Sequence, residues 1–328
     1  MRYSSSEVHD RYVMYLAPIL FLGLALFLYG VSSIPGEGTI GAAKVLVPSI
    51  VGFVLIVGFI FYSFKPKHPL LDLRLFANRN LAVASIVMFL FVMAFFGALL
   101  LVPTYFQQVR AESVLKAGLL VAPQGLGAML TMPIAGALSD KLPVGRIVPF
   151  GFIGIILGML GLTQTHADTS YWQVMACLFV MGLGMGGTMM PIMTSALKTL
   201  KAHDVARGST LINVLQQVGS SIGVALMSVL LTDHFKDSAA ATAAQAIGEA
   251  EAQGKNPPAE ALKVAQELGD KFMPTALSDM ADAFSSTYWV ALAILVVALV
   301  PVALLPRKHE ESHLLDDEGE GAGPVLMH

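Results

Sequence analysis

The composition of this 328-residue chain excludes a soluble globular protein. Hydrophobic residues make up 55% of it and charged residues only 13%, and the mean hydropathy is +0.69. A typical soluble domain carries about 25% charged residues. The net charge of -3 says little about partners, because in a membrane protein the informative quantity is the distribution of charge between loops. The single cysteine, Cys177, excludes an intramolecular disulfide. The chain is therefore predicted to be an all-α polytopic membrane protein.

Eight apolar runs are long enough to cross a bilayer as helices, which takes about 20 residues each. The predicted spans are 13–31, 43–64, 81–105, 115–137, 147–165, 172–196, 209–232 and 288–305. The remaining segments are predicted as a cytoplasmic N-terminal segment (1–12), a cytoplasmic amphipathic linker (65–80), an extracytoplasmic insertion (233–287) and an acidic cytoplasmic tail (307–328). Alanine-rich stretches at 238–252 and 259–268 favour helices in the insertion. The insertion holds too few large apolar residues to bury a core of its own.

Basic residues divide unevenly between the two sides of this arrangement. The short loops on one side contain only Lys44, Arg110 and Lys116. The side that holds both termini contains Arg2, Arg11, Lys65, Lys67, Arg74, Arg79, Lys141, Arg146, Lys198, Lys201, Arg207, Arg307 and Lys308. Because cytoplasmic loops are enriched in Lys and Arg, both termini are predicted to be cytoplasmic in a plasma (inner) membrane.

The short loop between the fourth and fifth spans carries the sequence GALSDKLPVGR, from Gly136 to Arg146. A loop this short predicts that the two spans are antiparallel neighbours. Gly136 is expected to let the end of one helix approach another closely. The Asp140 carboxylate is placed to meet either helix-start NH groups or a basic side chain. A solvated turn with ordinary topology charges, from Lys141 and Arg146, explains the same residues equally well.

Uncharged polar side chains recur within the spans, where an unpaired amide is costly and is expected to face a partner or a cavity. Spacings of three and four residues place one group on a single face of the seventh span. That group is Ser209, Asn213, Gln216, Gln217 and Ser220. It either forms hydrogen bonds to neighbouring helices or lines a water-filled path. Gln124, just after Pro123 in the fourth span, is a further cavity candidate, and Tyr105 is a weaker one that interfacial anchoring also explains.

The sixth span combines glycines with methionines in the run MGLGMGGTMMPIM. Glycines permit close helix contacts, and thioethers repack around varied apolar ligands. Met189 and Met193 are therefore candidates for substrate contact, although ordinary core packing explains such a stripe as well. Gly219 and Gly223 in the seventh span are predicted to form a packing seam. No Asp, Glu, Lys or Arg lies deep in any predicted span, so the sequence shows no intramembrane proton carrier.

Several of these segments resemble one transporter family. Gly136, Leu138, Ser139, Asp140, Lys141, Gly145 and Arg146 resemble the signature loop of the major facilitator superfamily. One departure is that Leu142, Pro143 and Val144 separate Lys141 from Gly145, where the family usually has one residue. The linker PKHPLLDLRLFANRN and the span segments LLVPTYFQQV, AGLLVAPQGLGAML and INVLQQVGSSIGVAL are similar to the fourteen-helix drug:proton antiporter branch.

The resemblance implies how the chain is organised. Residues 13–64 would be the two central helices of the fourteen, and 81–306 the six-helix carboxy-terminal bundle. Proton-linked carboxylates would lie in an amino-terminal bundle that this chain lacks, and the proton gradient would replace any cofactor. Gly136, Asp140, Lys141, Gly145 and Arg146 would form a cytoplasmic gate. Gln124, Asn213, Gln216, Gln217, Tyr105, Met189 and Met193 would be the candidates for the substrate path.

The function expected is therefore one half of a proton-coupled exporter of drugs or other lipophilic or cationic small molecules. A metabolite or siderophore carrier of the same fold is an alternative, because fold does not fix substrate. A second alternative is a half-transporter that works with a separate partner chain. An enzyme would rest only on the HExxH sequence of His309, Glu310 and His313, a zinc-protease spacing. Because these residues lie in a short acidic tail, neither an enzyme nor a metal site is predicted, and no nucleic-acid partner is expected.

Overall fold

A computed structural model of the chain describes residues 22–23, 25–26, 29–30, 43–63, 73–198, 200, 202–252 and 254–307. Within these ranges the regular structure is entirely helical. Six helices of the described part of the chain are long and apolar enough to cross a membrane. They are α4 (Arg79–Gln108), α5 (Val114–Ser139), α6 (Val144–Leu162), α7 (Tyr171–Lys198), α8 (Ala202–Lys236) and α11 (Phe272–Ala303). The prediction of an all-α polytopic membrane protein is confirmed.

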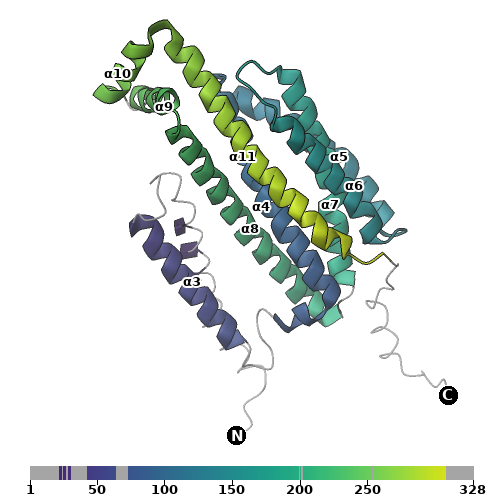
Figure 1. Cartoon of the computed structure of the whole chain (residues 1–328). Coiled ribbons are helices and arrows are strands. Elements are labelled where there is room, and N and C mark those ends of the chain that lie inside the picture. Colours follow the sequence, from purple (N-terminus) through teal and green to yellow (C-terminus); the bar gives the residue numbers. More distant parts are fainter. Residues whose placement is uncertain are drawn as a thin grey trace, which may run out of the picture.

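The elements that precede this bundle are described in part. Helix α3 (Ala43–Ser63) matches the second predicted span and lies outside the six-helix bundle in Figure 1. The 3-10 helix η1 (Leu73–Ala77) leads into α4, whose first turn is capped by the Asn78 side chain accepting from the backbone NH of Asn80. Most of the first predicted span, the start of the linker and the tail from residue 308, with the HExxH sequence, lie outside the described residues.

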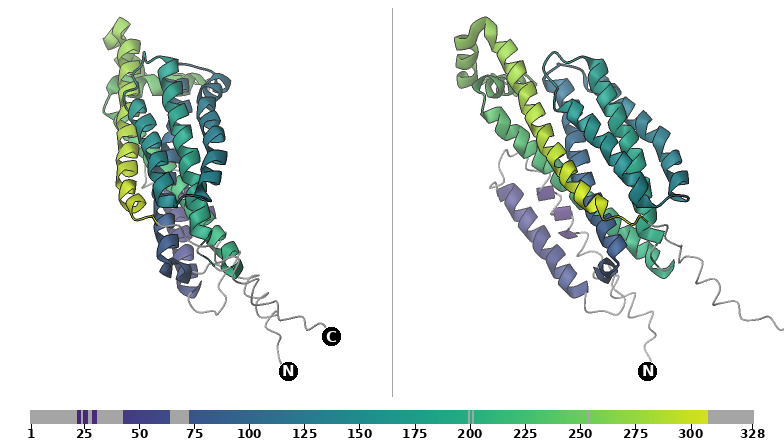
Figure 2. Two further views of the ribbon diagram at one scale, coloured as in Figure 1. Left: turned by 90° about the vertical axis from the view of Figure 1, so that its right-hand side faces the viewer. Right: turned by 45° about the vertical axis from the view of Figure 1, so that its right-hand side comes forward.

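The six spanning helices form two sequence triplets with inverted topology, α4–α5–α6 and α7–α8–α11 (Figures 1 and 2). Helix α4, the first of one triplet, packs on α8 and α11 of the other triplet. In the same way, α7, the first of the second triplet, packs on α5 and α6 of the first. Exchanging the triplets therefore reproduces the same set of neighbours, which is the pattern of an inverted repeat.

This arrangement corrects one prediction about the short loop. Helices α5 and α6 run antiparallel, but each packs mainly along α7 rather than along the other. The four residues from Asp140 to Pro143 join the two helices at one end of the bundle, while α7 lies against both.

Glycines line the seams where the helices come closest. A Cβ atom added at Gly223 in α8 would lie 1.9 Å from the Met93 carbonyl oxygen of α4, so the predicted seam at this glycine is confirmed. In α7, a Cβ at Gly182 would lie 2.0 Å from the Gln124 carbonyl oxygen of α5, and one at Gly184 would lie 2.4 Å from the Gly151 carbonyl oxygen of α6. Real Cβ contacts are never this short, so these positions permit close helix packing in the membrane.

The core of the bundle is centred on α4. Phe91 packs in a tilted arrangement against Phe95 and, across the bundle, against Phe152 of α6, with ring centroids 5.1 and 6.0 Å apart. Tyr105 meets Phe284 of α11 edge-on at 5.7 Å. These aromatic side chains are fully enclosed, and edge-to-face pairs add about 1 kcal/mol each beyond the area they bury. Helix α4 is thus the most enclosed span, and α5 and α8 are the least enclosed.

The segment between α8 and α11 differs in two respects from its prediction. Helices α9 (Ala239–Ala252) and α10 (Ala259–Leu268) form where alanine favours them, but α11 begins at Phe272 rather than at residue 288. The polar residues Asp279 and Asp282 hide this extension from a hydropathy pattern. The segment also buries a small core, contrary to expectation, because Ala243, Ala261 and Phe272 pack together with partly buried Ile247, Val264 and Leu268.

Candidate functional site

The polar face of α8 is open to the surroundings. Asn213 and Gln217, one turn apart, are both exposed, and Thr210 continues the same line. The hydroxyls of Ser209 and Ser220 donate to carbonyl oxygens of their own helix, those of Ala206 and Gln217. Among the described residues, no side chain of the predicted stripe forms a hydrogen bond to another helix. Both roles open from the sequence therefore stay predictions: the face lines a path, or it bonds to helices other than those described here.

Two glutamines keep a buried polar atom without a partner. Gln124 lies where α5 contacts α7, is 4% exposed, and its Oε1 accepts no hydrogen bond from the described residues. Gln216 on α8 has a buried Nε2 that likewise donates to none of them. An unsatisfied buried polar group costs about 1–3 kcal/mol. Such groups are suited to bind a ligand or water that supplies the missing hydrogen bond.

Tyr105 has a different environment from the other path candidates. It is 2% exposed, and its hydroxyl donates to the backbone oxygen of His166 over 2.6 Å. The ring packs against Phe106 and Phe284. Because both its ring and its hydroxyl are already engaged, Tyr105 holds the last turns of α4 against the α6–α7 loop, and its role in a substrate path stays a prediction.

The methionines of α7 divide between core and surface. Met181 is fully buried, Met189 and Met193 are partly buried against the main core, and Met190 is half exposed. The partial exposure of Met189 and Met193 leaves both core packing and ligand contact open to them, so their role in substrate binding stays a prediction.

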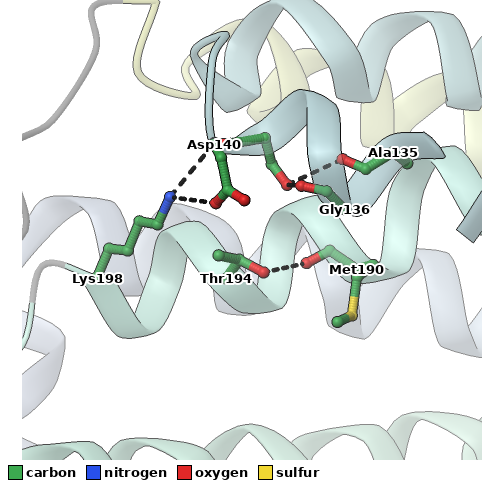
Figure 3. A network of polar contacts seen from close by, with 7 residues as sticks. Ala135, Gly136, Asp140, Met190, Thr194 and Lys198 are labelled. Atoms are coloured by element: carbon green, nitrogen blue, oxygen red, sulfur yellow. Dashed lines mark hydrogen bonds and ion pairs between the residues drawn. The ribbon is translucent and has the colours of Figure 1, made fainter. Parts of the chain in front are cut away.

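The α5–α6 loop is held to α7 by Lys198 (Figure 3). The Lys198 Nζ lies 3.3 Å from the Asp140 carboxylate and 3.3 Å from the Ser139 carbonyl oxygen. Asp140 therefore meets a basic side chain, as one of the two predicted options, while α6 begins at Val144 and its N-cap residue, Pro143, forms no side-chain cap. The Asp140 side chain is 72% exposed, so this ion pair is worth well under about 1 kcal/mol.

The two glycines of the signature loop behave differently. A Cβ at Gly136 would meet no atom of the described residues within 4 Å, so the predicted close approach is not found within this bundle. The close contacts of α5 with α7 lie deeper, at Gly127. Gly145 donates its backbone NH to the Pro306 carbonyl oxygen over 3.0 Å, and a Cβ there would lie 2.7 Å from that oxygen. Gly145 thus fixes the start of α6 beneath the end of α11, while Lys141 and Arg146 are exposed.

A charged cluster at the opposite end of the bundle was not anticipated. The Glu112 carboxylate accepts from the Tyr171 hydroxyl and pairs with Lys116 over 2.7 Å. Arg110 lies over the Tyr171 ring, 4.7 Å from its centroid, and donates to the Ala167 carbonyl oxygen. The hydrogen bonds from Lys116 and then from Tyr171 lower the pKa of Glu112 from its ordinary value near 4.5. The i,i+4 spacing of Glu112 and Lys116 was the available sequence signal.

Neither a metal centre nor a charged group deep in the membrane emerges from the described residues. No cluster of three or more His, Cys, Asp or Glu side chains in them has metal-binding geometry. The charged residues of the six spanning helices lie near helix ends, as at Lys116, Arg146, Lys198 and Asp204, or in the part of α11 that precedes residue 288, as Asp279 and Asp282 do. In the described part of the chain, the polar chemistry at mid-membrane depth is therefore that of amides and hydroxyls.

Comparison with known proteins gives a consistent result. The family model of the Major Facilitator Superfamily matches residues 7–224. The multidrug resistance protein B homologue of Mycobacterium tuberculosis H37Rv is 42% identical over 301 residues, covering 90% of this chain and 55% of that protein. The multidrug export protein EmrB of Escherichia coli K12 is 27% identical, covering 65% of this chain and 43% of that protein. The chain thus spans about half the length of these relatives.

A solved structure supports the fold. The inward-facing, unoccupied form of a bacterial homologue of the human lysosomal transporter Spinster superimposes with a TM-score of 0.54 and 18% identity. The match covers 86% of this chain and 64% of the transporter. The family match, the relatives' names and the six-helix bundle agree with the resemblance noted in the sequence. This chain belongs to the Major Facilitator Superfamily and is similar to its multidrug-resistance members.

Proposed function

We propose that this chain forms the carboxy-terminal half of a proton-coupled exporter of lipophilic or cationic small molecules. The observation that carries the proposal is the exposed amide face of α8, formed by Asn213 and Gln217 on a membrane-spanning helix. Two amides facing hydrocarbon would be costly, so this face is expected to meet water and substrate instead. Gln124, with its unpartnered Oε1, would supply a further hydrogen-bond acceptor from α5.

A second helical bundle is part of this proposal. Helices α5 and α8 are the least enclosed spans, and relatives of the chain are about twice as long as the part it matches. An amino-terminal bundle would cover these two helices, and a substrate site would lie between the halves. Alternating access would then come from rocking of one bundle against the other around that site.

Proton coupling is assigned to the amino-terminal bundle. The described spans hold their acidic residues near helix ends or, as Asp279 and Asp282, in the part of α11 that precedes the apolar run from residue 288. Proton relays in transporters use carboxylates or histidines inside the membrane. We therefore propose that this half contributes substrate contacts and gating. Met189 and Met193, partly buried beside the core of α7, would adapt to substrates of different shape.

The signature loop is proposed as the cytoplasmic gate of this half, in an inner membrane with both termini inside. Lys198 holds Asp140 while Gly145 fixes α6 under α11, so the loop couples the four helices α5, α6, α7 and α11 at one end of the bundle. Lys141 and Arg146 remain exposed there and would meet the amino-terminal bundle. The concentration of basic residues at this end supports the orientation.

The proposal is tested by efflux of rhodamine 6G from energised cells that make this chain alone or together with the amino-terminal bundle of the Mycobacterium tuberculosis relative. We expect insertion without efflux for the chain alone, and proton-dependent efflux when the bundle is supplied. Gln217→Ala is expected to weaken that efflux. Efflux by the chain alone, unaffected by Gln217→Ala, would overturn both the two-bundle arrangement and the path assigned to α8.

A further inference from the structure

A cavity lies at the end of the bundle opposite the signature loop. It is formed by the last turn of α4, the first turns of α11 and one face of α9, and has a volume of about 570 Å³. Pockets that bind drug-sized molecules have volumes of about 300–1,000 Å³. The cavity lies beyond the aromatic contact of Tyr105 with Phe284, which closes the membrane core beneath it. It is therefore separate from the path proposed on α8.

The lining of this cavity combines an apolar wall with a polar rim. The apolar side chains are Ile247, Phe272, Met273, Leu277 and Met280. The polar ones are Gln107, Gln108, Gln245 and Glu251. Aromatic and thioether groups accommodate flat or irregular apolar bodies, and amides supply hydrogen bonds that orient a ligand.

The charge at the rim is acidic. Glu251 is the only ionisable residue among those described that line the cavity. Of the nearby basic residues, Arg110 reaches instead to the Ala167 carbonyl oxygen and the Tyr171 ring, and Lys271 is exposed beside Phe272. A ligand head that carries positive charge is therefore favoured over one that carries negative charge.

The cavity depends on a segment that lies outside the stretch matched by the family model. The family model ends at residue 224, before α9, α10 and the extension of α11. The Mycobacterium tuberculosis relative covers 90% of the chain, whereas the Escherichia coli relative covers 65%. The small core of Ala243, Ala261 and Phe272 holds α9 and α10 on the extended α11, so the cavity wall is a packed structure.

We propose that this cavity binds an amphipathic small molecule with an apolar body and a cationic head, outside the membrane-spanning path. The head would lie beside Glu251 and the body against Phe272, Met273 and Leu277. The proposal rests on the lining of the cavity and does not require the chain to export the ligand. Failure of export and failure of binding are therefore separate results.

The first test is protection of an introduced thiol in the full chain, purified into lipid nanodiscs with Cys177→Ser as background. Met273→Cys places a thiol at a cavity position that is 55% exposed in the native side chain. Saturating rhodamine 6G is expected to slow its alkylation by a water-soluble maleimide at least threefold. Lys263→Cys, exposed on α10 away from the cavity, is the control whose rate is expected to stay unchanged. Equal rates at Met273→Cys with and without rhodamine 6G would overturn the proposal.

The second test concerns the charge. Glu251→Gln is isosteric at an exposed position and is expected to weaken rhodamine 6G binding about two- to fivefold, the range of a solvent-exposed ion pair. Glu267→Gln, exposed on α10, is the matched control and is expected to leave the affinity unchanged. Fluorescein, an anionic dye of similar size, is expected to bind more weakly than rhodamine 6G. A preference for fluorescein, or an equal loss in both variants, would contradict a cationic ligand at Glu251.

Discussion

The two faces of helix α8 differ in what they contact. One face places Gly219 and Gly223 against the backbone of α4, where no side chain fits. The other face exposes Asn213 and Gln217, whose amides have no hydrogen-bond partner on another helix of the described chain. The first face is optimised for contact within this bundle, and the second has the chemistry of a surface that meets water or a ligand.

Substitutions on the two faces of α8 should therefore affect different properties: stability on the glycine face and transport on the amide face. On the glycine face a single methyl group forces backbones apart, so folding suffers. On the amide face even a large change leaves the packing of the bundle intact, so folding should tolerate it.

Gly223→Ala should be the most damaging single methyl addition. The new Cβ would lie 1.9 Å from the Met93 carbonyl oxygen, and a backbone atom has no rotamer by which to move away. We expect a loss of about 3 kcal/mol, at the upper end of overpacking, seen as a lower apparent melting temperature in detergent. Gly136→Ala is the matched control, because nothing lies within 4 Å of its Cβ position. Equal destabilisation by the two variants would contradict a steric clash specific to the seam, because alanine by itself favours a helix over glycine.

The amide face should show the opposite behaviour. Gln217→Leu combined with Asn213→Leu removes both amides while keeping side chains of similar size. We expect efflux in the two-bundle assay to fall at least tenfold, about 1.4 kcal/mol. The apparent melting temperature should change little, because surface substitutions stay within about 0.5 kcal/mol. Loss of folding without a specific loss of efflux would assign these amides to structure.

Gln124 combines features of both faces, since it is buried at a helix contact yet keeps an unpartnered Oε1. Gln124→Met preserves the shape and removes the amide. We expect a gain in stability of about 1 kcal/mol, because an unsatisfied polar group is removed, together with weaker efflux. Gln107→Met, in which the lost amide already donates to the Pro103 carbonyl oxygen, is the control that should show no such gain. A destabilised Gln124→Met would mean that the amide is satisfied in the membrane.

The ion pair in the signature loop should matter little for folding. Asp140→Asn removes the charge that Lys198 meets at 3.3 Å, but the carboxylate is largely exposed. We expect less than about 1 kcal/mol of lost stability, decreasing further at high salt. Thermal unfolding at low and high ionic strength checks this expectation. A larger and salt-independent loss would show that the loop is enclosed by neighbouring structure.

The Glu112 cluster should produce the smallest effect and a defined pH dependence. Because its folded pKa is lowered, the carboxylate stabilises the fold above its ordinary pKa near 4.5 and loses that contribution as the pH falls through the lower, folded value. The difference in apparent melting temperature between the native chain and Glu112→Gln should therefore be constant from pH 7 to pH 5. It should shrink in more acidic solution. A difference that grows on acidification would contradict the sign of the shift.

The spanning helices could be predicted from the sequence because their cause is local. Runs of about 20 apolar residues dictate helices in a bilayer, and loop charges dictate orientation. The start of α11 was misplaced because Asp279 and Asp282 interrupt the apolar pattern while its buried face continues through Phe272 and Met280. That face packs against α4 and α9, so the start of α11 is determined by tertiary contacts, which a hydropathy window does not detect.

The candidate site was predictable only in part, for a related reason. The spacing of Asn213 and Gln217 placed both amides on one face, but which face is open depends on how α8 meets α4. Tyr105 resembled a polar residue at the end of a span, and only its contact with the His166 carbonyl oxygen shows its packing role. The cavity beside Glu251 joins residues from α4, α9 and α11, which no local pattern brings together.

The most direct test of the account is the water accessibility of the amide face of α8. Asn213→Cys and Gln217→Cys would be made in a Cys177→Ser background, with Leu157→Cys on the exposed apolar surface of α6 as the control. Alkylation by a small water-soluble maleimide in membranes containing both bundles should be fast at the two α8 positions and slow at the α6 position. Equally slow reaction at all three positions would place the amide face in lipid or in a sealed interface and contradict the path proposed here.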